Sequence, residues 1–147
     1  MDKRRLSKRL FRIAELRERF ARIRRGEAAR TVREQEALIT SLEQEQTAAR
    51  DSIHGEQGPI DGKWLQALEE SRQANKIKRD HADVELHARE KILKEEARVH
   101  IKTVDSMRSA EKVKERVIEQ WREEQESDER KELDDLGAVH LARQKDE

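Results

Sequence analysis

The sequence predicts an all-α fold, a long antiparallel hairpin of two helices that pack as a coiled coil. Residues 54–63, HGEQGPIDGK, hold three of the five glycines and the only proline, which is a strong turn signal. On both sides of this segment, apolar residues recur at steps of three and four, as in coiled-coil helices. Charged residues make up 45% of the chain and hydrophobic residues 33%, a composition typical of a disordered chain or a thin coiled coil. The apolar periodicity favours the coiled coil, so we treat residues 1–147 as one domain: a helix at about 4–53, a turn, and a helix at about 64–143.

The first predicted helix carries two apolar stripes, which we expect to face the second helix. The first stripe consists of Leu6, Ile13, Leu16, Phe20 and Ile23, and the second of Ala28, Val32, Gln35, Ile39, Leu42, Gln46, Ala49 and Ile53. The phase changes between Gly26 and Arg30. Glycine costs about 1 kcal/mol relative to alanine inside a helix, so we expect a bend or local unwinding there. The two glutamines either set the register of the coiled coil or mark a loose, partly solvated helix.

The start of the second predicted helix is well marked. The carboxylate of Asp61 can cap the helix by accepting a hydrogen bond from the backbone near Trp64. Ile60 and Leu65 have the spacing of a hydrophobic staple across this cap. Trp64 and Leu68 share one face of the helix. These signals predict a helix that begins directly after the turn.

The second predicted helix carries three apolar segments. They are Ala74, Ile77, His81, Val84 and Ala88; then Ala97, His100, Val104, Met107, Ile118 and Trp121, interrupted by Glu111 and Lys114; and finally Leu133, Leu136, Val139 and Leu141. At 1.5 Å per residue, the two helices have lengths of about 75 Å and about 125 Å. The end of the longer helix therefore lacks an intramolecular partner, and we expect another protein to cover its last apolar patch.

Charge is balanced overall but unevenly distributed. Residues 1–33 hold 13 Lys and Arg against 4 Asp and Glu, a net charge of +9, whereas residues 119–147 hold 5 against 11, a net charge of −6. A reversal of the chain brings these ends towards each other, whereas a parallel dimer of continuous helices places like charges side by side. The distribution therefore favours the hairpin.

The basic N-terminal segment is compatible with several roles. Its cations are Lys3, Arg4, Arg5, Lys8, Arg9, Arg12, Arg17, Arg19, Arg22, Arg24 and Arg25. They can form a solvated face that pairs with the acidic end of the chain, or bind an acidic protein, an anionic membrane surface or nucleic-acid phosphates. The neutral net charge and the scarcity of aromatic residues disfavour nucleic acid.

The sequence contains no catalytic or metal-binding pattern. It has no phosphate-binding loop, nucleophile elbow or HExxH motif, and a two-helix hairpin lacks an enclosed pocket. The histidines His81 and His87 are six residues apart, which does not place them on one helix face. We expect a non-enzyme with no cofactor, no metal and no small-molecule substrate. The absence of cysteine, of an 18-residue apolar run and of a signal peptide leads us to expect a soluble cytoplasmic protein.

Three segments of the chain resemble the flagellar type III export protein FliJ family, which is related to the YscO-type stalk proteins of virulence secretion. They are the basic opening LSKRLFRIAELRERFARIRRGEAAR, the Gly-rich turn followed by Trp64, and the ending ERKELDDLGAVHLAR at residues 129–143. The resemblance implies an antiparallel coiled coil similar to the central stalk of rotary ATPases. It implies as partners the hexameric export ATPase, the export-gate protein FlhA and, for some members, export chaperones.

The resemblance also implies which residues contact these partners. Contacts with the ATPase ring fall to residues at both ends of the chain, namely Arg4, Arg5, Arg9, Arg12, Leu133, Leu136 and Arg143. Contact with the export gate falls to His81. The sequence therefore leads to the hypothesis of a non-enzymatic stalk that couples an export ATPase to its gate, at the inner membrane by indirect association. The alternative is a coiled-coil scaffold or adaptor whose basic arm binds anionic membrane or nucleic acid.

Overall fold

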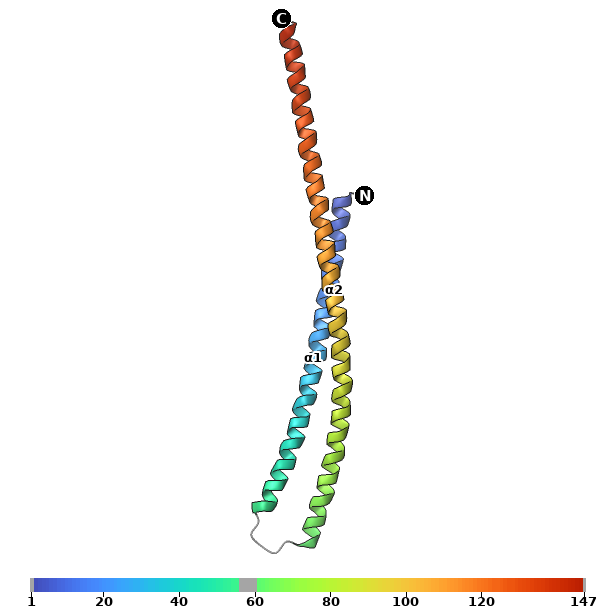
Figure 1. The fold of residues 1–147 in the computed structure, drawn as a ribbon, viewed down its shortest axis with the longest axis vertical. Helices are drawn as coiled ribbons and strands as arrows, with labels where there is room; N and C mark the ends of the chain where they lie inside the picture. The colour runs from blue at the N-terminus through green and yellow to red at the C-terminus, as the bar shows by residue number, and fades with distance from the viewer. Residues whose placement is uncertain (1, 56–60, 147) are drawn as a thin grey trace. The chain divides into compact units, whose positions relative to one another are not determined.

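The computed structural model describes residues 2–55 and 61–146, and it confirms an all-α hairpin. Helix α1 spans Lys3–Gly55 and helix α2 spans Gly62–Lys145, and the two helices pack against each other (Figure 1). No strand occurs among the described residues. Both helices extend slightly further than predicted, since His54 and Gly55 belong to α1 and Gly62 and Lys63 to α2. The Gly58–Pro59 turn signal and Ile60 of the staple lie outside the described residues.

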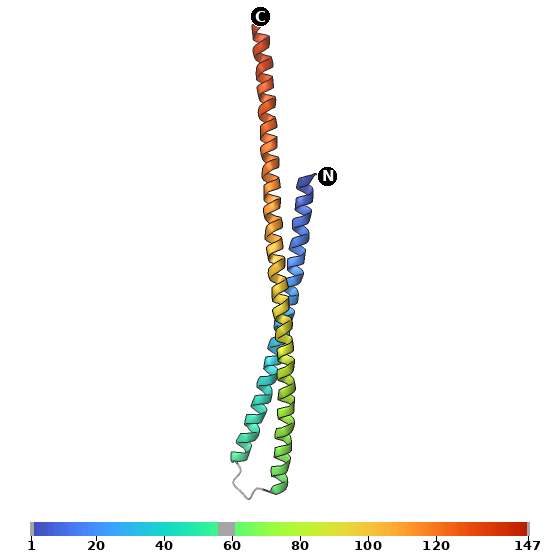
Figure 2. The ribbon, with the colours of Figure 1, turned by 45° about the vertical axis from the view of Figure 1, so that its right-hand side comes forward.

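The chain divides into two compact units, each containing a part of both helices. The terminal unit consists of residues up to Arg19 and from Lys102 onward, and the central unit consists of Phe20–Ile101. In both views of the chain, the segments of α1 and α2 within each unit lie side by side (Figure 2). Each unit is therefore a two-helix assembly in its own right.

An aspartate caps the start of each helix. The backbone N–H of Arg4 donates to Oδ1 of Asp2 over 3.0 Å, and the N–H of Lys63 donates to Oδ1 of Asp61 over 3.2 Å. Each aspartate carbonyl also accepts the first intrahelical bond, from Leu6 and Leu65 respectively, at 3.1 Å. A side-chain acceptor at this position satisfies a backbone donor that the helix leaves unpaired. The predicted cap at Asp61 is confirmed, with the N–H of Lys63 as its donor.

The residues of α1 that face α2 follow one another at steps of three and four along the whole helix, and we call this series of positions the frame. The buried and half-buried members of this frame are Arg4, Ser7, Phe11, Ala14, Glu18, Ala21, Ala28, Val32, Gln35, Ile39, Leu42, Gln46 and Ala49. The predicted second stripe is confirmed from Ala28 to Ala49, while the side chain of Ile53 lies outside the described set. Residues every seven positions apart, such as Ala14, Ala21 and Ala28, stay on one face, as expected for supercoiled helices.

The predicted first stripe of α1 is wrong. Its members are exposed by between 42% and 66%, because Ser7, Ala14 and Ala21 occupy the face towards α2 instead. The residues of this stripe therefore lie on the outer side of the helix, and the small residues, together with half-buried Phe11, lie on the inner side. The large side chains suggested the wrong face. The spacing of the correctly predicted stripe, continued from Ala28 back to Ala21 and Ala14, gives the right one.

The predicted local unwinding at Gly26 is also wrong. Gly26 lies inside α1, and no described glycine has a positive φ. A Cβ atom added to Gly26 meets nothing within 4 Å. The change of phase in the sequence arose because the first predicted stripe lies on the outer face of α1 and the second on its inner face.

The face of α2 was predicted correctly in one half and wrongly in the other. The second segment is confirmed at Ala97, His100, Val104, Met107 and Ile118, which are half-buried, whereas its last member, Trp121, is 39% exposed. Glu111 and Lys114, which interrupt the segment, are half-buried as well. Trp64 and Leu68, which were predicted to share one face, are both half-buried. The first segment is wrong, since Ala74, Ile77, His81, Val84 and Ala88 are exposed. The inner face there consists of Asn75, Arg79, Ala82, Leu86, Arg89 and Leu93, in which polar side chains interrupt the apolar signal.

Neither described helix contains a stretch that is apolar enough to cross the hydrocarbon core of a bilayer.

Candidate interaction surfaces

Polar side chains hold the two helices of the central unit in register. Nε2 of Gln35 donates a buried hydrogen bond to the carbonyl oxygen of Ala82 over 3.0 Å. Nη1 of Arg89 donates to the carbonyl oxygen of Thr31 over 3.0 Å. Because a shift of either helix would separate these atoms, the contacts favour one alignment. Of the two interpretations of Gln35, the structure supports the one in which it sets the register.

Further polar contacts join the same two helices. Arg79 Nη2 and Glu43 Oε1 form an ion pair at 2.7 Å, and Asn75 Nδ2 lies 3.5 Å from the carbonyl oxygen of Leu42. Arg25 Nη1 and His100 Nδ1 are joined by a hydrogen bond of 3.2 Å. The central unit thus combines small apolar contacts with polar contacts along its length.

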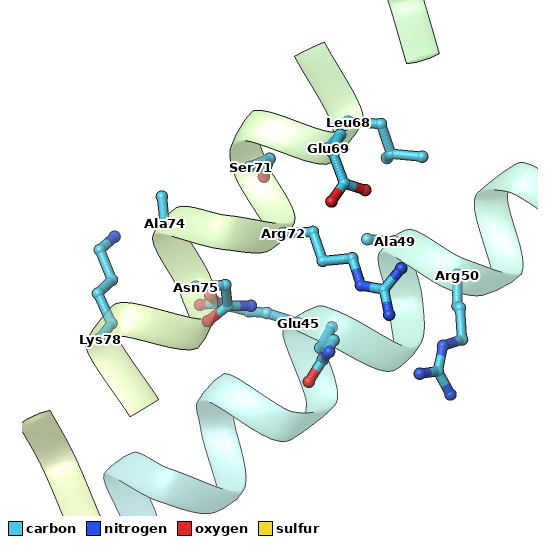
Figure 3. Close-up of a pocket in the computed structure, with 11 residues that line it drawn as sticks. Glu45, Ala49, Arg50, Leu68, Glu69, Ser71, Arg72, Ala74, Asn75 and Lys78 are labelled. Atoms are coloured by element: carbon cyan, nitrogen blue, oxygen red, sulfur yellow. The ribbon is translucent and has the colours of Figure 1, made fainter. Parts of the chain in front are cut away.

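A crevice of about 250 Å³ lies between α1 and α2 in the central unit (Figure 3). Ala49 and Leu68 provide apolar surface, while Glu45, Arg50 and Arg72 provide charges of both signs. Its lining contains one hydroxyl group, that of Ser71, and no histidine.

In the terminal unit, two cation–π contacts place the first turns of α1 beside α2. The guanidinium carbon of Arg4 lies 4.1 Å from the ring centroid of Trp121. Nζ of Lys114 lies 3.9 Å from the ring centroid of Phe11. Contacts of this kind contribute about 0.5–1 kcal/mol each at exposed sites. They fix the N-terminus of α1 at the level of Trp121.

Beyond Trp121, α2 continues without a partner helix. We call residues 122–146 the C-terminal extension; every one of them is exposed, and the segment continues past the start of α1 (Figures 1 and 2). At 1.5 Å per residue its length is about 37 Å. Its four largest apolar side chains are 51–67% exposed: Leu133, Leu136, Val139 and Leu141. The prediction that this patch lacks an intramolecular partner is confirmed.

The first turns of α1 present a second exposed apolar surface. Leu6, Leu10, Ile13 and Leu16 are 42–51% exposed. We call these four residues, with the exposed cations around them, the N-terminal outer face; the cations are Lys3, Arg5, Lys8, Arg9, Arg12 and Arg17. Sequence reasoning missed this surface, although tracing the frame of Ala28, Ala21 and Ala14 towards the N-terminus reveals it.

The expected pairing of the basic beginning with the acidic end of the same chain is wrong. In the terminal unit, α1 lies beside residues 102–121, which hold five Lys and Arg and four Asp and Glu. The acidic residues are concentrated in the extension, which continues past the start of α1. The unequal helix lengths therefore separate the two charged segments along the unit.

The structure does not bring the predicted ATPase-contact residues together in one site. Arg4 is half-buried against Trp121, while Arg5, Arg9 and Arg12 are exposed on α1. Leu133 follows Trp121 by 12 residues, which is about 18 Å along the helix. Leu136 and Arg143 lie further still, and both are exposed. The two groups are thus arranged one after the other along the terminal unit.

The histidines lie on separate parts of the helices. His81, the predicted gate contact, is exposed in the central unit. Nδ1 of His87 lies 2.8 Å from the carbonyl oxygen of Asp83, and Nε2 of His140 lies 3.3 Å from Nε2 of Gln144. Within residues 2–55 and 61–146, no group of three or more His, Cys, Asp or Glu side chains is arranged to hold a metal ion.

No known protein family, characterised protein or solved structure matches this chain.

Proposed function

We propose that this chain is a non-enzymatic coiled-coil stalk of a flagellar or related type III protein export apparatus, which couples the export ATPase hexamer to the export gate. The observation that supports the proposal best is the C-terminal extension, a single helix with exposed leucines that continues from a two-helix hairpin. A helix with an exposed apolar face is suited to a groove or ring lined by other helices. The resemblance of the sequence to the FliJ family supplies the identity of the partners.

In this proposal the extension enters the ATPase ring as a single helix, and Leu133 and Leu136 make its apolar contacts. Arg5, Arg9 and Arg12 lie nearer the start of α1 and meet acidic groups at the rim of the ring. Complementary charge at a rim mainly accelerates and orients association. The chemistry belongs to the ATPase, and the stalk supplies position and coupling.

The remaining partners in the proposal contact the central unit. His81 is exposed on α2 and is the residue that we assign to the gate protein FlhA. Export chaperones are further partners, and association with the inner membrane is indirect, through the apparatus. No cofactor and no small-molecule substrate take part in this proposal.

The test measures ATP turnover by the purified export ATPase with increasing amounts of the chain. We expect the chain to stimulate turnover and hexamer formation, and the variant Leu133→Asp/Leu136→Asp to lose both effects. The matched control is Ile77→Asp/Val84→Asp, which changes two apolar residues that are 58% and 71% exposed in the central unit. This control should stimulate as the unaltered chain does. Turnover that stays constant at saturating chain would refute the proposal.

The N-terminal outer face supports a second candidate function, that of a scaffold or adaptor whose basic arm binds an anionic membrane or nucleic acid. A helix with exposed leucines and flanking arginines is typical of peripheral membrane binding. The test measures cosedimentation with anionic vesicles, and binding to duplex DNA, over a series of salt concentrations. Binding that weakens with salt and requires Arg5, Arg9 and Arg12, without any effect on the ATPase, would favour this candidate.

A further inference from the structure

We propose that two copies of this chain form a reciprocal dimer, in which the C-terminal extension of each copy lies on the N-terminal outer face of the other. Both surfaces belong to the terminal unit. The dimer is tested on the chain alone, although it covers Leu133 and Leu136, which the proposed contact with the ATPase ring also uses.

Both surfaces present large apolar side chains to solvent. On the outer face, Leu6 and Leu10 are 42% and 51% exposed, and on the extension Leu133 and Leu136 are each 67% exposed. Burial of apolar area contributes about 25 cal/mol per Å², and neither surface is covered within its own chain. Two helices with such stripes can bury them against each other.

The charges of the two surfaces are complementary. Residues 2–19 hold eight Lys and Arg and three Asp and Glu, which gives a net charge of +5. Residues 122–146 hold five Lys and Arg and nine Asp and Glu, which gives a net charge of −4. Since the acidic segment lies beyond the basic one within the chain, a second copy can satisfy charges that one copy leaves apart.

The charges accompany the apolar residues at helical spacing. Glu129, Glu132 and Asp135 each precede an apolar residue of the extension by four positions, namely Leu133, Leu136 and Val139. On the outer face, Arg9 and Arg12 precede Ile13 and Leu16 by four positions. Residues four apart lie on the same side of a helix. Each surface therefore offers an apolar stripe with charges of one predominant sign beside it.

The lengths of the two surfaces permit both contacts at once. The outer face, from Lys3 to Arg17, covers about 22 Å of helix, and the extension covers about 37 Å. The extension starts where α1 starts, at the level of Trp121. A two-fold axis perpendicular to the helices therefore places each extension beside the outer face of the other copy. The same contact then forms twice, as in most homodimers.

This pattern favours a second copy over a lipid surface for the outer face. A lipid surface would cover the outer face but would repel the acidic extension and leave its leucines exposed. A second copy covers both surfaces with one contact. Vesicle binding therefore serves as an alternative outcome in the test below.

The first experiment measures the mass of the full chain by sedimentation equilibrium over micromolar concentrations at low and high salt. We expect a monomer–dimer equilibrium that weakens as salt rises, because exposed charges are screened. The variant Arg5→Glu/Arg9→Glu/Arg12→Glu and the variant Glu129→Lys/Glu132→Lys/Asp135→Lys should each weaken the dimer by at least about tenfold. Circular dichroism shows whether each variant keeps its helices.

The second experiment mixes these two variants. In the mixture, each acidic outer face meets a basic extension and each basic outer face meets an acidic extension. We expect the 1:1 mixture to form heterodimers, and a chain with both sets of reversals to dimerise by itself. The matched control Arg33→Glu/Arg50→Glu/Lys76→Glu changes three exposed cations of the central unit by the same total charge and should dimerise normally.

Three results would overturn the proposal. They are a chain that stays monomeric throughout, a dimer that both reversal variants retain, and reversal variants that lose the dimer but do not restore it when mixed. If the chain is monomeric and its outer face binds anionic vesicles, the lipid surface takes the place of the second copy. An unchanged ATPase turnover, by contrast, bears on the proposed stalk function alone.

Discussion

At the scale of single residues, many of the most buried positions between the helices carry small or polar side chains, beside the larger Val32 and Leu42. Ser7, Ala21 and Ala28 are more than 90% buried, and so is Gln35. Such side chains let the helices approach closely but remove little apolar area from water. Specific contacts such as that of Gln35 therefore have a large share in choosing one alignment over others.

Gln35 offers a direct test of this point. In the variant Gln35→Ala the buried hydrogen bond and the packing of the side-chain methylenes are lost, and we expect a decrease of about 1–2 kcal/mol in the free energy of unfolding. The variant Gln35→Leu replaces the amide with apolar volume, so its stability should equal or exceed that of the unaltered chain. Urea denaturation followed by circular dichroism measures both. If Gln35→Leu loses as much stability as Gln35→Ala, the amide itself stabilises the fold.

Gly26 is a site where a single methyl group should stabilise the protein. It lies inside α1 with space for a Cβ atom and without a positive φ. We expect Gly26→Ala to raise the free energy of unfolding by about 1 kcal/mol, which is the difference in helix propensity. Thermal unfolding measures the change, with Gly137→Ala in the C-terminal extension as a control that alters helicity without contact to α1. A loss of stability in Gly26→Ala would show that the glycine has a conformational role.

At the scale of elements, each helix has one part that packs and one surface that does not. The outer face of α1 carries exposed leucines beside cations, and α2 continues for 24 residues beyond Trp121. The cation–π contact between Arg4 and Trp121 marks the boundary between the packed and the single-helix part of α2. Two predictions concern this boundary.

The contact between Arg4 and Trp121 should be measurable as a coupling energy. In a double-mutant cycle of Arg4→Ala and Trp121→Ala, we expect a coupling of about 0.5–1 kcal/mol, the range for exposed cation–π pairs. The cycle is measured by chemical denaturation. Lys114→Ala and Phe11→Ala form a second cycle with a contact of similar geometry, 3.9 Å from nitrogen to ring centroid. Additive effects in both cycles would contradict the contacts.

The C-terminal extension should exchange its amide hydrogens faster than the paired part of α2. At concentrations where the chain is monomeric, residues 122–146 have only intrahelical contacts, such as the ion pair of Arg130 and Glu126 at 3.8 Å. Helices without tertiary packing are marginal in water, so they open more readily. Hydrogen exchange read by mass spectrometry should show low protection there and higher protection for residues 75–118. Equal protection in both segments would contradict the absence of a partner.

At the scale of the whole molecule, the chain buries less surface than a globular protein of its mass. Its accessible surface is 12492 Å² for 17.4 kDa, whereas a globular monomer of that mass has about 7,900 Å². The unfolded chain exposes about 25,000 Å², so folding buries about half of it rather than about 70%. Among the described residues, no large side chain is fully buried.

This difference in buried surface predicts a small heat capacity change of unfolding. Globular proteins show about 12–15 cal/mol/K per residue, and we expect a value at least about a quarter lower here. Differential scanning calorimetry at several pH values measures it, together with a reduced urea dependence of the unfolding free energy. A heat capacity change in the globular range would indicate burial beyond that of a single chain, as a dimer provides, so the measurement is made at the lowest practical concentration.

The sequence was sufficient for the fold class, the position of the reversal, the cap at Asp61 and the unpaired end of α2. These features depend on helix breakers, a local hydrogen bond and helix length, all of which are encoded within a few residues. It was not sufficient for the inner face near Ile13 or near Ile77. At those places several large apolar residues are exposed, and the inner face includes small residues such as Ala14 and polar ones such as Arg79. The outer face of α1 was missed for the same reason.

In the central unit, the donors Gln35 and Arg89 belong to side chains, but the acceptors at Ala82 and Thr31 belong to the peptide backbone. Every amino acid carries that carbonyl oxygen. Alignment of the hairpin should therefore tolerate many replacements of similar size at Thr31, while the donor positions accept few. In each of these contacts, replacing the donor residue removes the hydrogen bond, whereas replacing the acceptor residue leaves the carbonyl oxygen in place. The alignment of the hairpin is therefore more sensitive to mutation on the helix that provides the donor.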